Sequence, residues 1–309
     1  MAEGVTVISE AYAGLQSQAV GLAEAAGFAP VVVPIVPRAP WRWVSARLWP
    51  DPLRAVGWPV LGDGVLFSAG GTAAVVAAAR KPRGLLVQVQ HPRMDVRRFA
   101  LVVVNRHDGL TGPNVVVTRT ALHGVTAARL AAARAEWGPV FAHLPRPLVA
   151  VLVGGSNGRF RLDGAVAAAL GGQLAEMMQR DRVGVAMTPS RRTSAAAKAA
   201  LAGAVGPLGG WMWDGSGQNP YLGLLACADA IVVTEDSVSM VSEAVATGAP
   251  VLLAPLPGRS TRIRLFTRLL VEDGRVRPFA GRFEAWPVAP MDDTAMAGDE
   301  VRRRLGLPR

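Results

Sequence analysis

The stretch from Thr234 to Gly258, TEDSVSMVSEAVATGAPVLLAPLPG, places a polar turn, a short helical segment and an apolar run in immediate succession. With the apolar residues AIVV before it, the stretch is typical of a strand, a helix that begins near Ser237, and a second strand. Continuous apolar strands that alternate with helices form parallel sheets covered on both faces. This stretch therefore predicts a parallel α/β fold.

The same alternation extends along the whole chain. The earlier apolar runs are VTVIS, VVVPIV, GVLFSAG, GLLVQVQ, ALVVVN and NVVVT, with helices expected near 15–26, 72–80 and 121–135. The segment GPVFAHLPRPL interrupts the pattern with three prolines and predicts a linker. After it, the runs LVAVLV, VGVAMT, AIVVT and APVLLAP alternate with further helices, expected near 164–179 and 193–201.

We therefore predict two Rossmann-like parallel-sheet domains that face each other across a cleft, because ligands of open α/β sheets bind beyond the carboxyl ends of the strands. The N-terminal domain is expected to cover 1–143 and the C-terminal domain 144–292. A final helix within 293–309 is expected to begin at Asp293 or Thr294 and to pack back on the N-terminal domain.

The composition fits a folded protein and leaves three explanations for its basic charge. Of the 309 residues, 50% are hydrophobic and 18% charged, and the net charge is +10. Solvated helix faces are the simplest explanation, an anionic membrane surface is the second, and nucleic acid is disfavoured because no aromatic residues are interleaved with the arginines. The denser arginine groups are Arg93, Arg97, Arg98, Arg259, Arg262, Arg264, Arg268, Arg302, Arg303 and Arg304.

The sequence favours a cytoplasmic protein with, at most, peripheral membrane contact. Cys227, the single cysteine, lies in an apolar run and is expected to be a small core residue. The start lacks the pattern of a secretory signal, and no apolar run is long enough to span a bilayer. Four tryptophans near two of the arginine groups suggest a face that binds anionic lipid. These tryptophans are Trp41, Trp43, Trp49 and Trp58.

Three strand ends of the C-terminal half carry residues suited to binding a phosphate. Glycines and helix N-termini present N–H groups to an anion, arginine binds phosphate with two parallel hydrogen bonds, and hydroxyls add further bonds. Each set taken alone also fits a simple turn or a helix cap. The candidates are Gly154, Gly155, Ser156, Asn157 and Gly158 after the first strand; Ser190, Arg191, Arg192 and Thr193 after the second; and Asp236, Ser237, Ser239 and Glu243 after the third.

The segments GGSNG, SRRT, TEDSVSMVSEAVATGAPV and RLLVEDGRVRPFAG, with NRHDGLTGPNVVVT in the first half, resemble the mitochondrial-fission ELM family. The second half also resembles the GT-B glycosyltransferases, above all the enzyme that adds N-acetylglucosamine to the lipid-linked peptidoglycan precursor. This resemblance implies a GT-B-like fold, an N-terminal domain for the acceptor, and a C-terminal domain for a nucleotide diphosphate sugar as donor. The loop 154–158, with Ser237 and Ser239, would bind the diphosphate, and Glu243 would bind the ribose.

Two functions follow as hypotheses. The first is a transferase, without cofactor or metal, that moves a sugar to an acceptor such as a lipid at the inner face of a membrane. Its general base would be His107, oriented by Asp108, just beyond a strand of the first domain, with His91 and Glu10 as alternatives. The chain lacks the Q-x-x-N motif of the peptidoglycan enzyme and has PGRSTRIRLF in its place, which leaves donor-sugar recognition open. The second hypothesis is a non-catalytic adaptor, since the plant family is associated with recruiting a dynamin-like GTPase to mitochondria.

Overall fold

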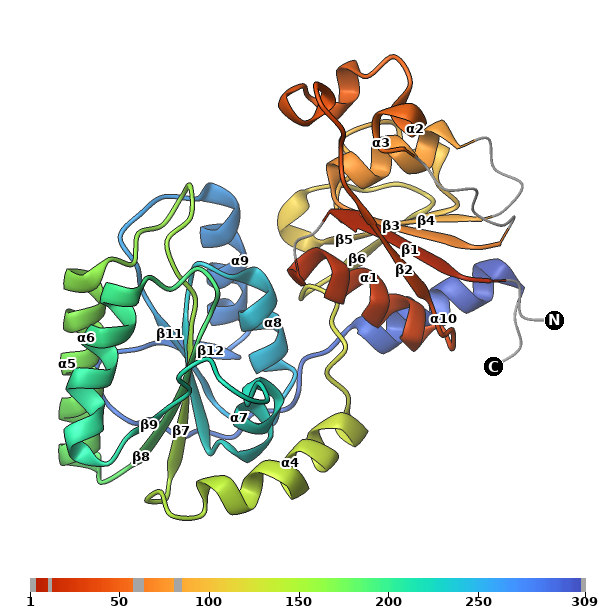
Figure 1. Ribbon diagram of the computed structural model, residues 1–309. Helices are drawn as coiled ribbons and strands as arrows, with labels where there is room; N and C mark the ends of the chain where they lie inside the picture. Colours follow the sequence, from red (N-terminus) through yellow and green to blue (C-terminus); the bar gives the residue numbers. More distant parts are fainter. Residues whose placement is uncertain (1–3, 11–12, 58–63, 81–84, 307–309) are drawn as a thin grey trace. The chain divides into compact units, whose positions relative to one another are not determined.

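The structure is a computed structural model that describes residues 4–10, 13–57, 64–80 and 85–306 (Figure 1). The chain forms two compact units. Unit 1 comprises Met1–Gly124 and Asp292–Arg309, and unit 2 comprises Val125–Met291. Each unit is built around one parallel sheet, and each sheet has six strands among the described residues. The predicted fold class, a parallel-sheet α/β protein with two Rossmann-like domains, is therefore confirmed.

Unit 1 has the strand order β2-β1-β3-β4-β5-β6. The strands are β1 (Thr6–Glu10), β2 (Val31–Ile35), β3 (Leu66–Ala69), β4 (Leu86–Val89), β5 (Leu101–Asn105) and β6 (Val115–Thr118). The helices are α1 (Ala13–Ala25), α2 (Pro52–Ala55), α3 (Gly71–Ala79) and α10 (Thr294–Leu305), and the 3₁₀ turns are η1 (Trp41–Trp43), η2 (Ala46–Leu48), η3 (Val96–Arg98) and η4 (Arg106–Asp108). One core lies between the sheet and α1 with α10, and a second between the sheet and α2 with α3.

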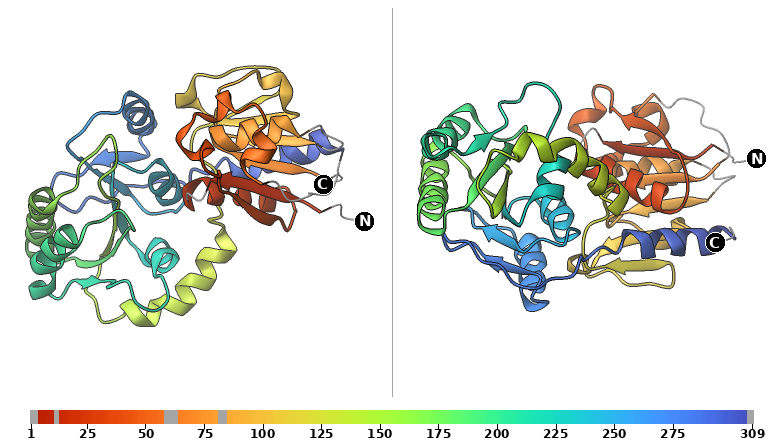
Figure 2. Two further views of the ribbon diagram at one scale, coloured as in Figure 1. Left: turned by 45° about the horizontal axis from the view of Figure 1, so that its top comes forward. Right: turned by 90° about the horizontal axis from the view of Figure 1, so that it is seen from below.

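The C-terminal helix α10 lies beside α1 (Figures 1 and 2). A Cβ atom at Gly298 would be 2.6 Å from the carbonyl carbon of Ala25, so glycine permits the close approach of the two helices. Asp293 precedes the helix but makes no capping bond. Its carboxylate instead accepts hydrogen bonds from the Arg119 backbone N–H, at 2.6 Å, and from the Arg119 guanidinium. These contacts join the last segment of the chain to unit 1.

Unit 2 has the strand order β12-β11-β10-β7-β8-β9. The strands are β7 (Leu148–Val153), β8 (Gly184–Pro189), β9 (Trp211–Met212), β10 (Ala230–Thr234), β11 (Val251–Ala254) and β12 (Val276–Pro278). The helical elements are α4 (Ala127–Phe141), α5 (Gly164–Asp181), α6 (Ala195–Val205), η5 (Gly206–Leu208), α7 (Tyr221–Cys227), α8 (Val238–Val245) and α9 (Thr261–Glu272). Helices α5 and α6 cover one face, whereas α4, α7 and α8 cover the other (Figure 1).

The types of residue in each strand reflect the position of that strand in its sheet. All six residues of β7 are buried, because a central parallel strand is covered by helices on both faces. Strand β2 is partly exposed and contains Pro34, which cannot donate a ladder hydrogen bond and is tolerated at a sheet edge.

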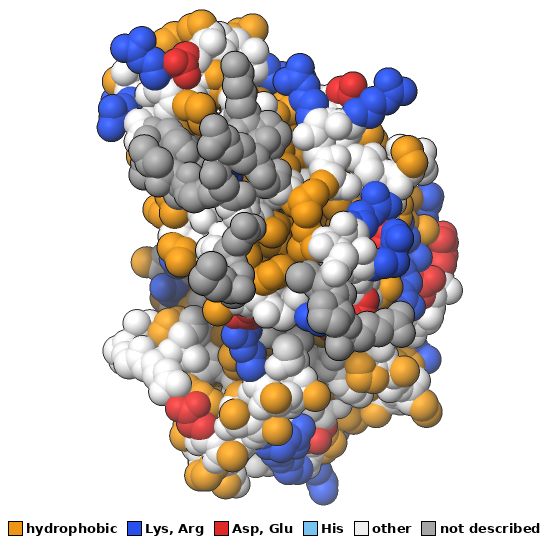
Figure 3. Space-filling model, turned by 90° about the vertical axis from the view of Figure 1, so that its right-hand side faces the viewer, with side chains coloured by type: hydrophobic (Ala, Val, Ile, Leu, Met, Phe, Trp, Pro, Cys, Tyr) orange, Lys and Arg blue, Asp and Glu red, His pale blue; other side chains and the backbone are white. Residues whose placement is uncertain are grey.

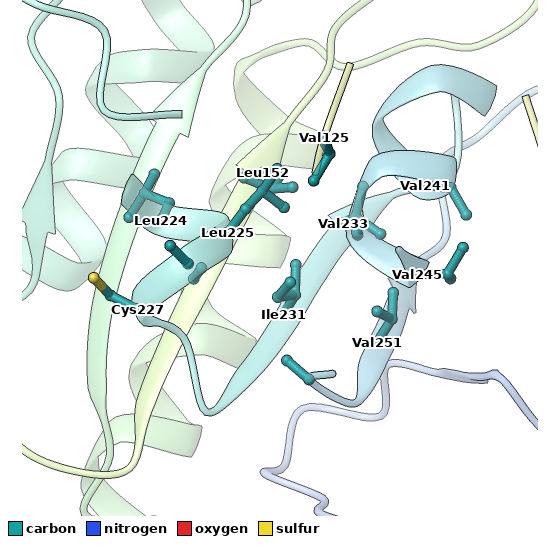
Figure 4. Close-up of a cluster of buried hydrophobic side chains, with 14 of the residues drawn as sticks. Val125, Leu152, Leu224, Leu225, Cys227, Ile231, Val233, Val241, Val245 and Val251 are labelled. Atoms are coloured by element: carbon teal, nitrogen blue, oxygen red, sulfur yellow. The ribbon is translucent and has the colours of Figure 1, made fainter. Parts of the chain in front are cut away.

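Figure 4 shows side chains of β7, β10 and α8 meeting in one apolar cluster of unit 2, with Cys227 at the end of α7. Cys227 is buried, as expected for a core residue.

The boundary between the units differs from the sequence-based prediction. The contacts divide the chain after Gly124, whereas we expected the division after residue 143. Helix α4 packs on α7 of unit 2: a Cβ atom at Gly223 would be 2.2 Å from Cγ of Trp137. The expected linker is therefore wrong in its first part. Pro139 lies inside α4, and Phe141 is fully buried in the core of unit 2.

Within the described ranges, the structure contains no helix that combines the length and the apolar character needed to cross a bilayer.

Candidate functional site

The strand order of unit 2 reverses between β7 and β10, which makes this the topological switch point of its sheet. The chain proceeds from β7 outward to β8 and β9, then returns to pair β10 with the other side of β7. In the register, Leu152 of β7 is opposite both Thr188 of β8 and Val233 of β10. The three loops that carry the candidate residues therefore begin at the same edge, where open α/β sheets bind ligands.

Packing requires glycine at the first two positions of the loop after β7. The N–H groups of Gly154 and Gly155 donate to Thr234 Oγ1 at 2.8 Å and to Asp236 Oδ2 at 3.2 Å. A Cβ atom at Gly154 would lie 2.2 Å from Asp236 Oδ1, and one at Gly155 would lie 2.3 Å from the backbone of Arg192. The glycine pair is thus explained by close contacts within the protein, without a ligand.

An ion pair between a buried carboxylate and a partly exposed arginine connects two of the three loops. The Asp236 side chain is fully buried, and its Oδ2 atom is 2.7 Å from Nη1 of Arg192. Oδ1 of Asp236 accepts a hydrogen bond of 2.7 Å from Thr234. Because a carboxylate removed from water needs compensation, the arginine and the hydroxyl account for its burial. Arg192 was predicted to bind phosphate, but in the structure one of its terminal nitrogens is engaged by Asp236.

The hydroxyls of the second loop are also engaged by the protein. Ser190 donates to the Gly154 carbonyl at 2.7 Å, and Thr193, which is buried, donates to the same oxygen. Ser194 rather than Thr193 caps α6, by accepting from the Ala197 N–H at 3.2 Å. Arg191 is exposed. Ser190 and Thr193 therefore hold the first two loops together.

The tip of the glycine loop is exposed and yet well ordered by its own contacts. Ser156, Asn157 and Gly158 are exposed. Ser156 Oγ accepts from the Leu162 N–H at 2.9 Å, and Asn157 Oδ1 accepts from the N–H groups of two following residues. The next residues pair with the loop after β11 through the bridge between Phe160 and Gly258. This leaves a fixed, solvent-facing turn beside the more deeply buried glycine pair.

Helix α8 begins as predicted, with Ser237 as its N-cap accepting from the Met240 N–H at 3.3 Å. Ser239 lies in the first turn and is partly buried. The far end is held by Arg275, which is 3% exposed and donates to the carbonyl groups of Val245, Thr247 and Ala249. Burial lowers the pKa of Arg275 to about 10.

Glu243 was predicted to bind a ribose, but its carboxylate accepts a hydrogen bond from the hydroxyl of Tyr221 on α7. Burial raises the pKa of Glu243 to about 7, against a smaller lowering by the bond from Tyr221. The same burial, together with the nearby Glu243, raises the pKa of Tyr221. Close to neutral pH, the carboxyl group can therefore hold a proton that an ordinary glutamate would have lost.

In unit 1, the structure argues against His107 and Asp108 as a catalytic pair. Both side chains are less than 5% exposed, and the distance from His107 Nε2 to Asp108 Oδ1 is 3.9 Å. Asp108 accepts from the Asn105 N–H at 3.3 Å and forms a capping box at η4. The local pattern after β5 was correct in placing these residues at the strand end, but their side chains turn into the protein.

The two alternative bases lie elsewhere at the same edge of the unit 1 sheet. Glu10 ends β1 at the switch point between β1 and β3, and it is partly exposed. A Cβ atom at Gly70, the N-cap of α3, would be 3.5 Å from the Glu10 carboxylate. His91 uses Nδ1 to accept from the Arg93 N–H at 2.9 Å. Both side chains are partly exposed, so each stays an alternative to His107.

Three residues of this region were missed from the sequence: Tyr221, Thr234 and Arg275. The opening stretch begins with Thr234, yet nothing local indicates that its hydroxyl accepts from the Gly154 N–H and donates to Asp236. Arg275 lies in DGRVRP, which resembles an ordinary surface turn. No group of three or more His, Cys, Asp or Glu side chains within the described ranges could hold a metal ion.

Comparison with known proteins identifies the family and the fold. The family described as Mitochondrial fission ELM1 matches residues 13–305. Mitochondrial fission protein ELM1 of Arabidopsis thaliana is 35% identical over 247 residues, which are 71% of this chain and 58% of that protein. The chain thus matches little more than half the length of this relative.

Two solved structures are similar over nearly the whole chain. UDP-GlcNAc 2-epimerase from Methanocaldococcus jannaschii, in complex with UDP-GlcNAc and UDP, has a TM-score of 0.59 at 12% identity and covers 98% of this chain and 99% of its own. The glycosyltransferase SnogD from Streptomyces nogalater has a TM-score of 0.57 at 16% identity, covering 99% and 95%. These similarities establish a GT-B-like fold. From the family match, the chain belongs to the mitochondrial fission ELM1 family.

Proposed function

We propose that the chain binds a nucleotide diphosphate sugar at the switch point of unit 2 and transfers the sugar to an acceptor, such as a lipid at the inner face of a membrane. One observation carries the proposal. The exposed tip 156–158 follows Gly155, whose N–H donates to Asp236, and Asp236 immediately precedes the N-cap of α8. A fixed turn beside a helix N-terminus suits a diphosphate.

The chemistry would rest on the chain's own groups. The N-terminus of α8 carries a partial positive charge, and the outer donors of Arg192 add to the positive field at this edge. Charge that develops on the departing diphosphate would be stabilised there. Glu243 and Tyr221, on neighbouring helices, would contact the nucleoside.

The structural neighbours support the choice of ligand to test first. The Methanocaldococcus epimerase was solved with UDP-GlcNAc and UDP. We therefore expect UDP and UDP-GlcNAc to stabilise this chain, and saturation at one hundred times the Kd would contribute about 2.7 kcal/mol to the free energy of unfolding. Titration calorimetry and thermal unfolding with uridine, guanosine, thymidine and adenosine diphosphates and their sugars would measure this. No binding of any of them would contradict the proposal.

A glycine variant tests the location of the site. A Cβ atom at Gly158 would meet no atom within 4 Å, so Gly158→Ala should leave the fold intact. If the diphosphate approaches the backbone of this turn, the added methyl group should weaken its binding roughly tenfold. Gly172→Ala is the matched control, since its Cβ would also lie in open space, on α5. Equal affinities for the wild type and Gly158→Ala would remove the turn from the site.

A second function, a non-catalytic interaction protein on the same scaffold, is favoured by a separate observation. Arg192, Thr193 and Asp236 satisfy one another or the backbone without a ligand. The Arabidopsis relative is named for mitochondrial fission. Under this alternative, no nucleotide would change the melting temperature, and Gly158→Ala would behave like Gly172→Ala in every assay.

A further inference from the structure

The segment between β2 and α2 exposes large apolar side chains in unit 1. Trp43 is 69% exposed and Leu48 is 72% exposed, and Val36 and Val44 are exposed beside them. Neither η1 nor η2 buries any of its residues. In Figure 1 this segment, residues 36–54, is the red-orange stretch that follows β2, runs into α2 and packs on α3. Exposed apolar side chains concentrated in one short segment mark an interaction site more often than isolated ones do.

The segment that carries these exposed side chains has a defined backbone structure. The Arg38 N–H donates to the Ala55 carbonyl at 2.8 Å and so joins the two ends of the segment. Trp49 lies inside with only 6% exposure, and its indole N–H donates to the Val44 carbonyl at 3.0 Å. Prolines at positions 37, 40, 50 and 52 restrict the backbone further. The apolar side chains are thus held outward on a fixed frame.

The charge of the segment is strongly positive. Arg38, Arg42, Arg47 and Arg54 stand against a single acidic residue, Asp51. That carboxylate is used locally, because it caps α2 by accepting from the Leu53 and Arg54 N–H groups at 3.1 Å. The guanidinium of Arg42 lies 4.1 Å from the centre of the Trp43 ring. Figure 3, with this end of unit 1 at the top, shows basic and apolar side chains there.

We propose that residues 36–54 bind the surface of an anionic bilayer, with Trp43 and Leu48 entering the interfacial layer and the arginines contacting lipid phosphates. A tryptophan suits the boundary between headgroups and acyl chains, and each arginine near an anionic surface adds attraction. A partner for this segment must offer negative charge and an apolar layer together, and a bilayer offers both. Nucleotide binding in unit 2 is not required.

The proposed membrane face differs from the one expected from the sequence. Of the four tryptophans, Trp49 is buried, Trp41 is partly buried, and Trp58 lies outside the described residues. The arginine groups near residues 93–98 and 259–268 belong to different units. The arginines that accompany Trp43 are instead those of the segment itself.

Flotation of the full chain with vesicles tests the proposal. We expect recovery with phosphatidylcholine vesicles that contain phosphatidylglycerol, little recovery with phosphatidylcholine alone, and a loss of binding as salt is raised. The double variant Trp43→Ser with Leu48→Ser should lose at least tenfold in partitioning, because both side chains contribute apolar area. Arg42→Gln with Arg47→Gln should lose about thirtyfold, at roughly 1 kcal/mol for each arginine.

The matched control is Val31→Ser with Met296→Ser. Val31 and Met296 are exposed apolar side chains of unit 1 outside the segment, so their loss should leave binding unchanged. Unaltered melting temperatures for all three double variants would verify the fold. The proposal would be overturned if anionic vesicles failed to bind the wild type. Binding that survived the Trp43 and Leu48 substitutions, or that fell equally in the control, would also overturn it.

Discussion

At the carboxyl edge of the unit 2 sheet, an ion pair between Asp236 and Arg192 connects the loops. At the same edge of unit 1, a hydrogen bond between two neutral side chains connects strands β3 and β4. In unit 1, Ser68 donates to Oε1 of Gln88 at 2.5 Å, and the Gln88 amide donates to the Val89 carbonyl at 2.6 Å. Ser68 and Gln88, like the Asp236 side chain, are fully buried. Two sheets of related topology thus satisfy buried polar groups in different ways.

This difference indicates at which edge a single substitution should lower the stability of the fold more. Removing the arginine would leave a buried carboxylate without compensation, and removing the carboxylate leaves two buried donors without their acceptor. Removing one partner of a neutral pair leaves only an unsatisfied dipole, which costs less. We therefore expect the unit 2 edge to be the more sensitive of the two to single substitutions.

The largest effect is expected for Asp236→Ala. The substitution leaves Arg192 without its carboxylate and removes the acceptor of the Gly155 N–H and the Thr234 hydroxyl. It should lower the free energy of unfolding by roughly 2 to 4 kcal/mol, measured by denaturant titration, because two buried donors lose their acceptor while the Arg192 side chain, 38% exposed, keeps contact with water. Asp236→Asn, which retains the shape and one acceptor oxygen, should cost less.

An exposed ion pair of the same unit provides the control. Arg268 and Glu272 are 3.5 Å apart on α9, and both side chains are more than half exposed. Glu272→Ala should therefore change stability by less than about 1 kcal/mol. If Asp236→Ala cost no more than Glu272→Ala, the ion pair would have no role in holding the loops together.

The next effect is a pH dependence that arises from Glu243. The pKa of this group is about 7 in the folded chain, above its ordinary value of 4.5, so the folded state binds more protons between these pH values. Stability from this group is complete below about pH 4.5 and is lost as the pH rises to about 7, by up to about 3 kcal/mol. Glu243→Gln does not ionise and should lose this dependence.

Thermal unfolding of the wild type and Glu243→Gln from pH 5 to pH 8 would measure how the difference in their stability changes with pH. The glutamine variant should gain relative stability as the pH rises. Tyr221→Phe should shift the wild-type transition to higher pH, because the Tyr221 hydroxyl lowers the pKa of Glu243. A constant difference between the wild type and Glu243→Gln at every pH would show that Glu243 is ionised throughout.

The smallest effect is expected in the neutral network of unit 1. Ser68→Ala removes the donor to Gln88 Oε1 and should cost about 1 to 2 kcal/mol. Ser45→Ala is the control in the same unit, since Ser45 is exposed and its side chain makes no capping bond. Denaturant titration of Ser68→Ala and Asp236→Ala compares the two edges directly. A larger loss for Ser68→Ala than for Asp236→Ala would reverse the comparison.

The sequence predicted the elements well where local patterns control them. The opening stretch was expected to start a helix near Ser237, and α8 begins at Val238 with Ser237 as its cap. The glycine loop was expected directly after a buried strand, and it follows β7. A capping bond spans three residues, and a buried parallel strand must be apolar on both faces, so these features can be recognised from neighbouring residues alone.

The sequence by itself determined the two parallel-sheet domains and the edge at which the polar loops gather. Only the tertiary structure decided what those loops contact: Arg192 and Asp236 are distant in sequence, and Glu243 bonds to Tyr221 of another helix. The tertiary structure also shows that α4 belongs to unit 2 and that the His107 side chain is buried. The physical reason is that strand and helix periodicity depends on near neighbours, whereas the partner of a buried charge depends on which strands the sheet places side by side.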